Sequence, residues 1–207
     1  MTEPLNIESI RDAMASHEPD TRASENATRN AAVAMIIANH EELDLAALFI
    51  QRAEHPGDPW SGQMAMPGGR NEDSDASYQH AAMRETLEEV GVTLTDEMCI
   101  GRLHDLYGGR LEAHRMAVSP YVFDVGPVPK VTLNYEVADT VWVPLEFMRY
   151  PENTTPYVFH LDPEGREFPA FRYESYTIWG LTFRILANFY RTLGIEHPAD
   201  PIATDVE

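Results

Sequence analysis

Two long apolar runs open the patterned part of the chain. Ala31–Ala38 and Leu45–Gln51 are both apolar, and the polar stretch Asn39–Asp44 separates them. Apolar runs of this length with polar turn residues between them are typical of strands, so two joined strands are predicted. A short apolar run, Gln63–Met66, follows and ends at Pro67-Gly68-Gly69, which interrupts any regular element.

The pattern becomes helical between Asp75 and Val90. Four apolar residues recur there at spacings near three and four, the period of one helix face: Ala82, Met83, Leu87 and Val90. Gly91 is placed to end this helix, because glycine readily adopts the left-handed conformation found just past a helix terminus. Either Asp75 or Ser77 can cap the start.

More strands and one closing helix are expected in the second half of the chain. The predicted strands are Cys99–Leu106, Ala117–Val125 and Thr140–Val143, with a turn at Gly108-Gly109, and a hairpin formed by Tyr157–Leu161 and Glu167–Tyr173. The closing helix is predicted over Ser175–Leu193. The expected organisation is an N-terminal extension outside the core (residues 1–30), one domain (31–195) and a polar C-terminal tail (196–207).

Composition and charge narrow the classes of partner. The 207 residues carry a formal net charge of −19, with Lys130 as the only lysine. Polymeric nucleic acid is therefore not expected as a partner, because a phosphate backbone is held by clustered cations. The apolar runs are too short to span a bilayer, so no membrane segment is expected. Cys99 is the only cysteine, so no internal disulfide is expected. A cytoplasmic location is expected, and a homodimer is left open.

Three carboxylates lie on adjacent turns of the predicted helix. Glu85 and Glu89 are four residues apart and Glu88 lies between them, so all three project from one side. Like charges at this spacing repel, and either solvent or cations must neutralise them. Hard divalent ions prefer such oxygen ligands and bind them together with substrate phosphates. The alternative is an ordinary solvated helix face on which Arg84 pairs with Glu88.

The sequence around these glutamates resembles a known motif. Arg84-Glu-Thr-Leu-Glu-Glu-Val-Gly-Val92 is similar to the second half of the Nudix box, with Thr86 in a slot that is usually apolar. The first half differs, since the spacing from Gly69 to Glu85 is one residue longer than usual. Ala76 stands where the box has glutamate, and Asp75 is a candidate to replace that residue.

The segment before the box resembles one branch of this superfamily, the coenzyme A diphosphatases. The shared features are the longer spacing and the Gly62-Gln63 pair ahead of Pro67-Gly68-Gly69. The chain departs from the branch at Trp60, which usually is histidine, and at Arg52, which lies one residue farther from Gly62 than expected. Four later segments are also similar to this branch, although core packing explains their residues equally well. They are Ser119–Val122, Asn134–Val137, Trp142–Leu145 and Ile178–Thr182.

The resemblance implies a fold, a cofactor and a set of site residues. The fold would be α/β, an α/β/α sandwich around a mixed sheet with a catalytic loop-helix-loop. Mg²⁺ or Mn²⁺ would be held by the peptide oxygen of Gly69 and the carboxylates of Glu85, Glu88 and Glu89. Arg84 would orient the glutamates, and Glu85 or Glu89 would act as general base, two roles that sequence does not separate.

The resemblance also implies a substrate, a nucleoside diphosphate derivative cut at its phosphoanhydride bond. For coenzyme A the products would be 4′-phosphopantetheine and 3′,5′-ADP. Arg52 and Arg70 are candidates for binding phosphates and Glu136 for reaching the metal site, and a plain surface charge is the alternative for each. ADP-ribose or a dinucleotide is a second substrate hypothesis. A Nudix module that binds nucleotide without cutting it is a third hypothesis, which the complete glutamate set disfavours.

Overall fold

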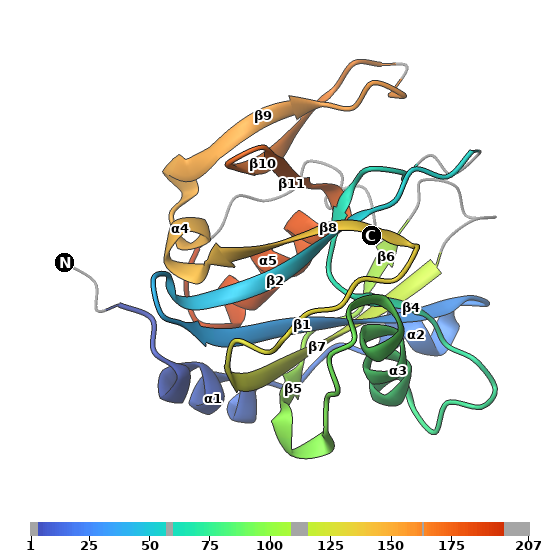
Figure 1. Cartoon of the computed structure of the whole chain (residues 1–207), viewed down its shortest axis with the longest axis vertical. Helices are drawn as coiled ribbons and strands as arrows, with labels where there is room; N and C mark the ends of the chain where they lie inside the picture. The colour runs from blue at the N-terminus through green and yellow to red at the C-terminus, as the bar shows by residue number, and fades with distance from the viewer. Residues whose placement is uncertain (1–3, 57–59, 109–115, 163, 197–207) are drawn as a thin grey trace.

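A mixed sheet forms the centre of the computed structural model, which describes residues 4–56, 60–108, 116–162 and 164–196. Strand β1 lies between β2, which is antiparallel to it, and β7, which is parallel to it (Figure 1). The other strands extend the sheet at both sides or pair with the ends of these three. The strands are β1 (Asn30–His40), β2 (Asp44–Arg52), β3 (Met64–Ala65), β4 (Gly68–Arg70), β5 (Cys99–Arg102), β6 (Leu106–Gly108), β7 (Met116–Pro127) and β8 (Val137–Pro144).

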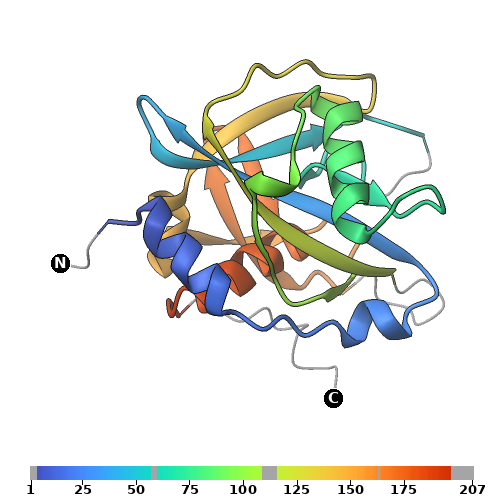
Figure 2. The same ribbon diagram turned by 90° about the horizontal axis from the view of Figure 1, so that it is seen from below.

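Helices cover both faces of this sheet. Figure 2 shows α3 on one side and α1 and α5 on the other. The helices are α1 (Ile7–Ser16), α2 (Arg22–Asn26), α3 (Tyr78–Val90), α4 (Leu145–Arg149) and α5 (Gly180–Thr192), with short 3-10 turns at Asp96–Met98 and Pro151–Asn153. The predicted α/β/α sandwich around a mixed sheet is confirmed.

The position of β1 between two layers of helices explains why its sequence is continuously apolar. Met35 and Ile37 pack into the core under α1 and α5, whereas Ala34 and Ile36 pack into the core under α3. Alternate side chains of a strand point to opposite faces, so a strand covered on both sides needs apolar residues at every position. The apolar run from residue 31 to 38 is therefore a consequence of the two helical layers.

A second, three-stranded sheet precedes the last helix, and one part of it was not expected. Strands β9 (Thr154–Val158) and β10 (Glu167–Tyr173) form a hairpin; β10 has the predicted bounds, whereas β9 starts three residues before the predicted Tyr157–Leu161 and ends at Val158. The predicted helix over residues 175–193 is wrong at its start, because β11 (Tyr176–Trp179) pairs with β10 and α5 begins only at Gly180. Gly180 has a φ of 60°, a left-handed conformation that suits glycine at this change of direction.

The first helix belongs to the core, contrary to the expectation for residues 1–30. Ile10 and Met14 are buried in the cluster under α1 and α5. Arg11 also reaches Asp124 of β7, with 2.6 Å between Nη2 and Oδ2. The weak amphipathic pattern of this helix is thus enough to dock it on the sheet. The domain boundary at residue 30 stays a prediction, and the expected tail lies almost entirely outside the described residues.

The remaining predictions for single elements have mixed outcomes. The expected strand over residues 99–106 is two strands, β5 and β6, both antiparallel to β7. The turn expected at Gly108-Gly109 lies partly outside the described residues. Within the described part of the chain, no helix combines the length and the apolar character needed to cross a membrane.

Candidate active site on helix α3

Two glycines bring the β4 backbone against α3. Gly68 donates its N–H to Oε2 of Glu89 at 2.9 Å. A Cβ on Gly68 would lie 2.3 Å from the Ala32 carbonyl oxygen, and one on Gly69 would lie 2.4 Å from the carboxylate of Glu85. Both distances are shorter than any normal contact. At Gly68 the obstacle is the β1 backbone, so only glycine fits there, whereas at Gly69 it is the end of the Glu85 side chain.

The ends of α3 match the sequence signals for a helix start and stop. Ser77 is the N-cap, and its Oγ accepts the N–H of His80 at 3.2 Å. Gly91 ends the helix with a φ of 68°, as predicted for a left-handed terminal residue. Of the two cap candidates, Ser77 therefore takes the role and Asp75 is left for another contact.

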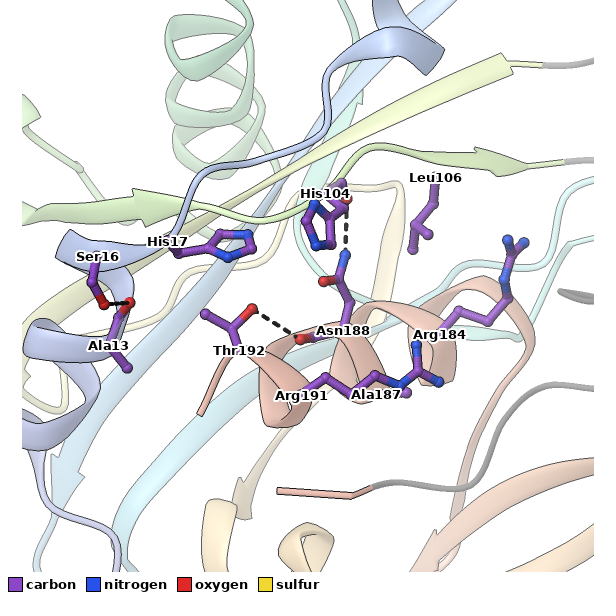
Figure 3. A pocket seen from close by; sticks show the side chains of 10 residues that line it. All are labelled: Ala13, Ser16, His17, His104, Leu106, Arg184, Ala187, Asn188, Arg191 and Thr192. Atoms are coloured by element: carbon purple, nitrogen blue, oxygen red, sulfur yellow. Dashed lines mark hydrogen bonds between the residues drawn. The ribbon is translucent and has the colours of Figure 1, made fainter. Parts of the chain in front are cut away.

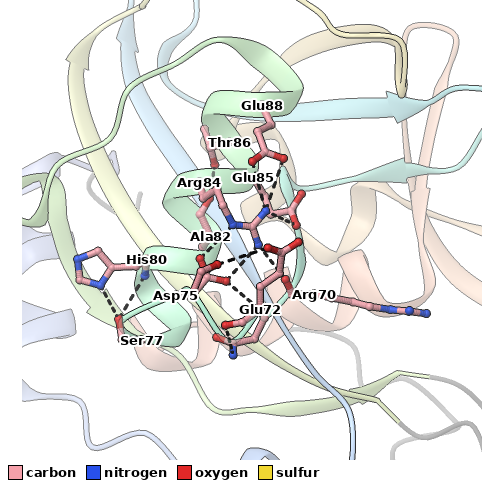
Figure 4. A network of polar contacts seen from close by, with 12 residues as sticks. Arg70, Glu72, Asp75, Ser77, His80, Ala82, Arg84, Glu85, Thr86 and Glu88 are labelled. Carbon is pink, nitrogen blue, oxygen red and sulfur yellow. Dashed lines mark hydrogen bonds and ion pairs between the residues drawn. The ribbon is translucent and has the colours of Figure 1, made fainter.

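Arg84 is the centre of an ionic network around α3 (Figure 4). Its Nε and Nη2 donate to the two carboxylate oxygens of Asp75 at 3.0 and 3.1 Å. Its Nη1 lies 3.0 Å from Glu85 Oε1 and 3.4 Å from Glu88 Oε1, and Nη2 also donates to the Arg70 carbonyl oxygen at 3.0 Å. The guanidinium thus ties the loop before the helix to two of the three glutamates.

Asp75 is the partner of Arg84 whose role the sequence left open. Its side chain is 5% exposed, and the hydrogen bonds from Arg84 hold the pKa of this carboxyl below its usual value. A forked pair of this kind is stronger than a single contact and has a fixed geometry. Asp75 thereby anchors Arg84 from the loop that precedes the helix.

Glu89 and Glu85 are carboxylates held out of solvent. Glu89 is 4% exposed, and burial raises its pKa to about 7, with the N–H of Gly68 and the charge of Arg52 opposing that rise. Burial also raises the pKa of Glu85, and the neighbouring charge of Glu136 raises the pKa of both carboxyls. Buried acids with raised pKa values in a cluster are characteristic of sites that bind cations or move protons.

The oxygen donors at this site fit a hard divalent cation. The side chain of Glu88 is 55% exposed, so it faces outward from the buried pair formed by Glu85 and Glu89. In the described chain, no three acidic, histidine or cysteine side chains are gathered closely enough to enclose an ion by themselves. Mg²⁺ needs no such cage, since one or two carboxylates with substrate phosphates and water suffice for it.

Two of the three candidate substrate residues lie beside Glu89, and one does not. Arg52 is the last residue of β2 and Glu136 immediately precedes its partner strand β8, and Ala53 donates its N–H to the Glu136 carbonyl oxygen at 2.8 Å. Both influence the pKa of Glu89 through their charges. The Arg70 side chain is exposed and extends away from the network in Figure 4, while its carbonyl oxygen holds Arg84.

An aromatic cluster lies next to the segment that leads into the glycines. Trp60 is stacked on Phe159 with the ring planes 6° apart, and Phe159 in turn contacts Trp179. The Trp179 indole N–H donates to the side-chain oxygen of Gln63. Sequence reasoning missed this cluster, because its members come from a loop and a hairpin a hundred residues apart.

Comparison with known proteins identifies the family. Residues 28–161 match the family model described as the NUDIX domain, which covers β1, the glycine loop, α3 and the strands up to β9. The chain belongs to the Nudix family. A crystal structure of a MutT/nudix family protein from Enterococcus faecalis has the same fold, with a TM-score of 0.57, 16% sequence identity, and coverage of 93% of this chain and 76% of that one.

Curated relatives include proteins named for coenzyme A. The mitochondrial coenzyme A diphosphatase NUDT8 of Homo sapiens is 29% identical over 141 residues, which are 66% of this chain and 58% of that protein. The uncharacterized Nudix hydrolase NudL of Escherichia coli is 28% identical over 169 residues, which are 81% of this chain and 84% of that protein. The chain spans 45% to 65% of the length of the first three curated relatives.

Proposed function

We propose that this protein hydrolyses the phosphoanhydride bond of coenzyme A or an acyl-coenzyme A, releasing 3′,5′-ADP and the corresponding 4′-phosphopantetheine. One observation carries the proposal: the carboxylates of the buried Glu89 and the half-buried Glu85 lie against the Gly68-Gly69 backbone in a chain of the Nudix family. The likeness to the coenzyme A diphosphatase NUDT8 and the Gly62-Gln63 pair support the choice of substrate.

The cofactor in this proposal is Mg²⁺ or Mn²⁺. The peptide oxygen of Gly69 and the carboxylates of Glu85, Glu88 and Glu89 are the proposed ligands. A divalent ion bound there would neutralise diphosphate oxygens and lower the pKa of a water molecule. The donor set contains oxygen only, which favours these ions over zinc or copper.

The residues of the chain have separate tasks in the reaction. Arg84 positions Glu85 and Glu88 and touches no substrate, since its donors are already taken by Asp75, the two glutamates and a carbonyl oxygen. Glu85 or Glu89 accepts the proton of the attacking water. One oxygen of Glu89 is held by the Gly68 N–H, which leaves Oε1 to receive that proton.

Substrate contacts are proposed for Arg52 and Glu136 and, more distantly, for Arg70. The charge of Arg52 lowers the pKa of Glu89, which supports a contact between the Arg52 guanidinium and the diphosphate. The charge of Glu136 raises the pKa of both Glu85 and Glu89, which supports a contact of Glu136 with the metal or its water ligands. Arg70 is exposed at the rim, where it can meet a phosphate farther along the substrate. The cytoplasmic location and the homodimer remain predictions.

The test is a substrate panel with product identification by mass. Coenzyme A, dephospho-coenzyme A and ADP-ribose are incubated with the protein and Mg²⁺ or Mn²⁺. We expect coenzyme A to have the highest kcat/KM, by about ten- to a hundredfold if one desolvated arginine binds its 3′-phosphate. Equal values for all three would overturn the substrate assignment only. Turnover that persists after exhaustive EDTA treatment would overturn the metal assignment, and binding without turnover would favour a nucleotide-binding module.

A further inference from the structure

A second pocket lies on the face of the sheet opposite α3. It opens between α1, α5 and the segment just before β6, and it has a volume of about 480 Å³. Its polar lining includes two arginines and two histidines, and among the described residues that line it none is acidic. Since the chain carries 34 acidic residues against 15 lysines and arginines, a pocket of this composition stands out.

The two histidines present hydrogen-bond donors in the pocket. His17 and His104 lie edge to face, with their ring centroids 4.6 Å apart (Figure 3). His104 Nδ1 accepts the backbone N–H of Asp20 at 2.8 Å, so the neutral ring carries its proton on Nε2. Nε2 of His17 is buried and makes no hydrogen bond to the described chain, and an unpaired buried polar atom is costly unless a ligand satisfies it.

The two arginines come from one side of α5. Arg184 and Arg191 are seven residues apart, which is two helical turns, so both project on the same side. Arg184 Nη1 donates to the Tyr107 carbonyl oxygen at 2.9 Å, which fixes its guanidinium beside the pocket. Arg191 is exposed, and its side chain makes no hydrogen bond or ion pair with the residues that the structure describes, although its carbonyl oxygen accepts the N–H of Gly194.

The side-chain amide of Asn188 completes the pocket wall between the histidines and the arginines. Asn188 is 4% exposed and donates its side-chain N–H to the His104 carbonyl oxygen at 3.0 Å. That bond holds the loop that carries His104 against α5. In Figure 3 the amide lies directly below the His104 ring, and Thr192 lies one turn farther along the helix. Hydrogen bonds thus hold three of the side chains that line the pocket, His104, Arg184 and Asn188.

We propose that this pocket binds a small anion that carries a phosphate group. Guanidinium and imidazole N–H groups match the several acceptor oxygens of phosphate, whereas a carboxylate has only two. The volume falls within the range of small-molecule sites. The sheet separates the pocket from α3, so it is a binding site distinct from the one proposed for catalysis.

Isothermal titration calorimetry with inorganic phosphate and pyrophosphate tests the proposal, at constant ionic strength and with EDTA present. Wild-type protein should bind with one saturable site. Arg191→Gln and His17→Gln should each weaken binding by about tenfold or more. Arg29→Gln is the matched control, because Arg29 is exposed and does not line the pocket, and its affinity should equal that of the wild type.

A spectroscopic measurement on the unaltered protein keeps the test independent of folding in the variants. In ¹H–¹⁵N spectra of the imidazole groups, phosphate should shift the signals of His17 and His104 and leave that of His40 unchanged. Unaltered His17 and His104 signals, or wild-type affinity in both Arg191→Gln and His17→Gln, would overturn the site. An equal response to acetate would overturn the choice of a phosphate ligand.

Discussion

The two faces of the central sheet differ in the side chains that meet their helices. Where α3 meets β1 the buried residues are small, such as Ala32 and Ala34 of the sheet and Ala82 of the helix, while larger residues such as Phe123 complete the same cluster. Under α5 the contacts are made by bulky ones, such as Phe183 and Phe189. Small side chains allow a helix to approach a sheet closely, and large ones bury more apolar area for each residue.

This difference separates the chemistry from most of the stabilisation. Close approach of α3 lets a backbone N–H of β4 reach Glu89 and leaves no room for a side chain at Gly69. The carboxylates held there oppose folding, because burial disfavours their charge. The apolar face under α5 offsets that cost. Each prediction below alters one side of this comparison.

The largest effect is expected from neutralising the buried carboxylates. Glu85→Gln and Glu89→Gln should each lower turnover by at least about a hundredfold, the scale of losing a metal ligand or general base. Circular dichroism should show a folded protein in both cases. Glu42→Gln, at an exposed turn, is the control and should keep full turnover. Near-normal turnover in both active-site variants would show that the α3 face is not the site.

Substitutions of the adjacent glycines should separate activity from stability. In Gly69→Ala the new methyl group meets the end of the Glu85 side chain, which can move, so turnover should fall by up to about a hundredfold with little loss of stability. In Gly68→Ala it meets the backbone of Ala32 and Val33, which cannot move, so the protein should lose about 3 kcal/mol. Urea unfolding and steady-state kinetics measure the two effects, and similar stability losses in both variants would contradict the distinction.

The cost of the buried acid should appear as a pH-dependent stability difference in metal-free protein. The pKa of Glu89 is raised from 4.5 to about 7, so between these values the folded state binds the proton that the unfolded state has lost. Stability contributed by this group therefore falls as pH rises through that window. With EDTA present, Glu89→Gln should be more stable than wild type by about 3 kcal/mol at pH 8. At pH 4 the difference should vanish, and a constant difference would refute the assignment.

Sequence patterns with short-range causes predicted the fold well. Continuous apolar runs predicted β1 and β2, and Gly91 predicted the end of α3, because burial on two faces and a left-handed terminus leave local signatures. The error at β11 has the opposite cause. Tyr176–Trp179 is apolar and adjoins a helix, so only its pairing with β10 makes it a strand. The docking of α1 on the sheet likewise depends on residues far away in the sequence, so no local pattern predicted it.

The same distinction applies to the candidate site. The glutamates of α3 and their arginine follow one another in sequence, so their proximity was predictable from helical spacing. The approach of Arg52 and Glu136 to Glu89 depends on the β2–β8 pairing, which no local pattern encodes. The pocket between α1 and α5 joins residues about 170 positions apart, and no sequence motif predicts it.

The smallest effect is expected at the one position inside the helical motif that departs from the usual apolar residue. Thr86 is fully buried on the sheet side of α3, and its hydroxyl donates to the Ala82 carbonyl oxygen at 2.7 Å. That oxygen also accepts the helical N–H of residue 86, so removing the hydroxyl leaves no buried acceptor unpaired. Thr86→Val keeps the branched shape and should change the free energy of unfolding by less than about 1 kcal/mol.

Turnover in Thr86→Val should stay within about twofold of the wild type, because the side chain faces the core and not the glutamates. Thr86→Ser is the matched control, since it keeps the hydroxyl and removes a buried methyl group, and it should cost about 1 kcal/mol through the small cavity. Urea unfolding of the wild type and the two variants measures the change in the free energy of unfolding that each substitution causes. A larger loss in the valine variant than in the serine variant would mean that the hydroxyl, not the packing, holds α3 on the sheet.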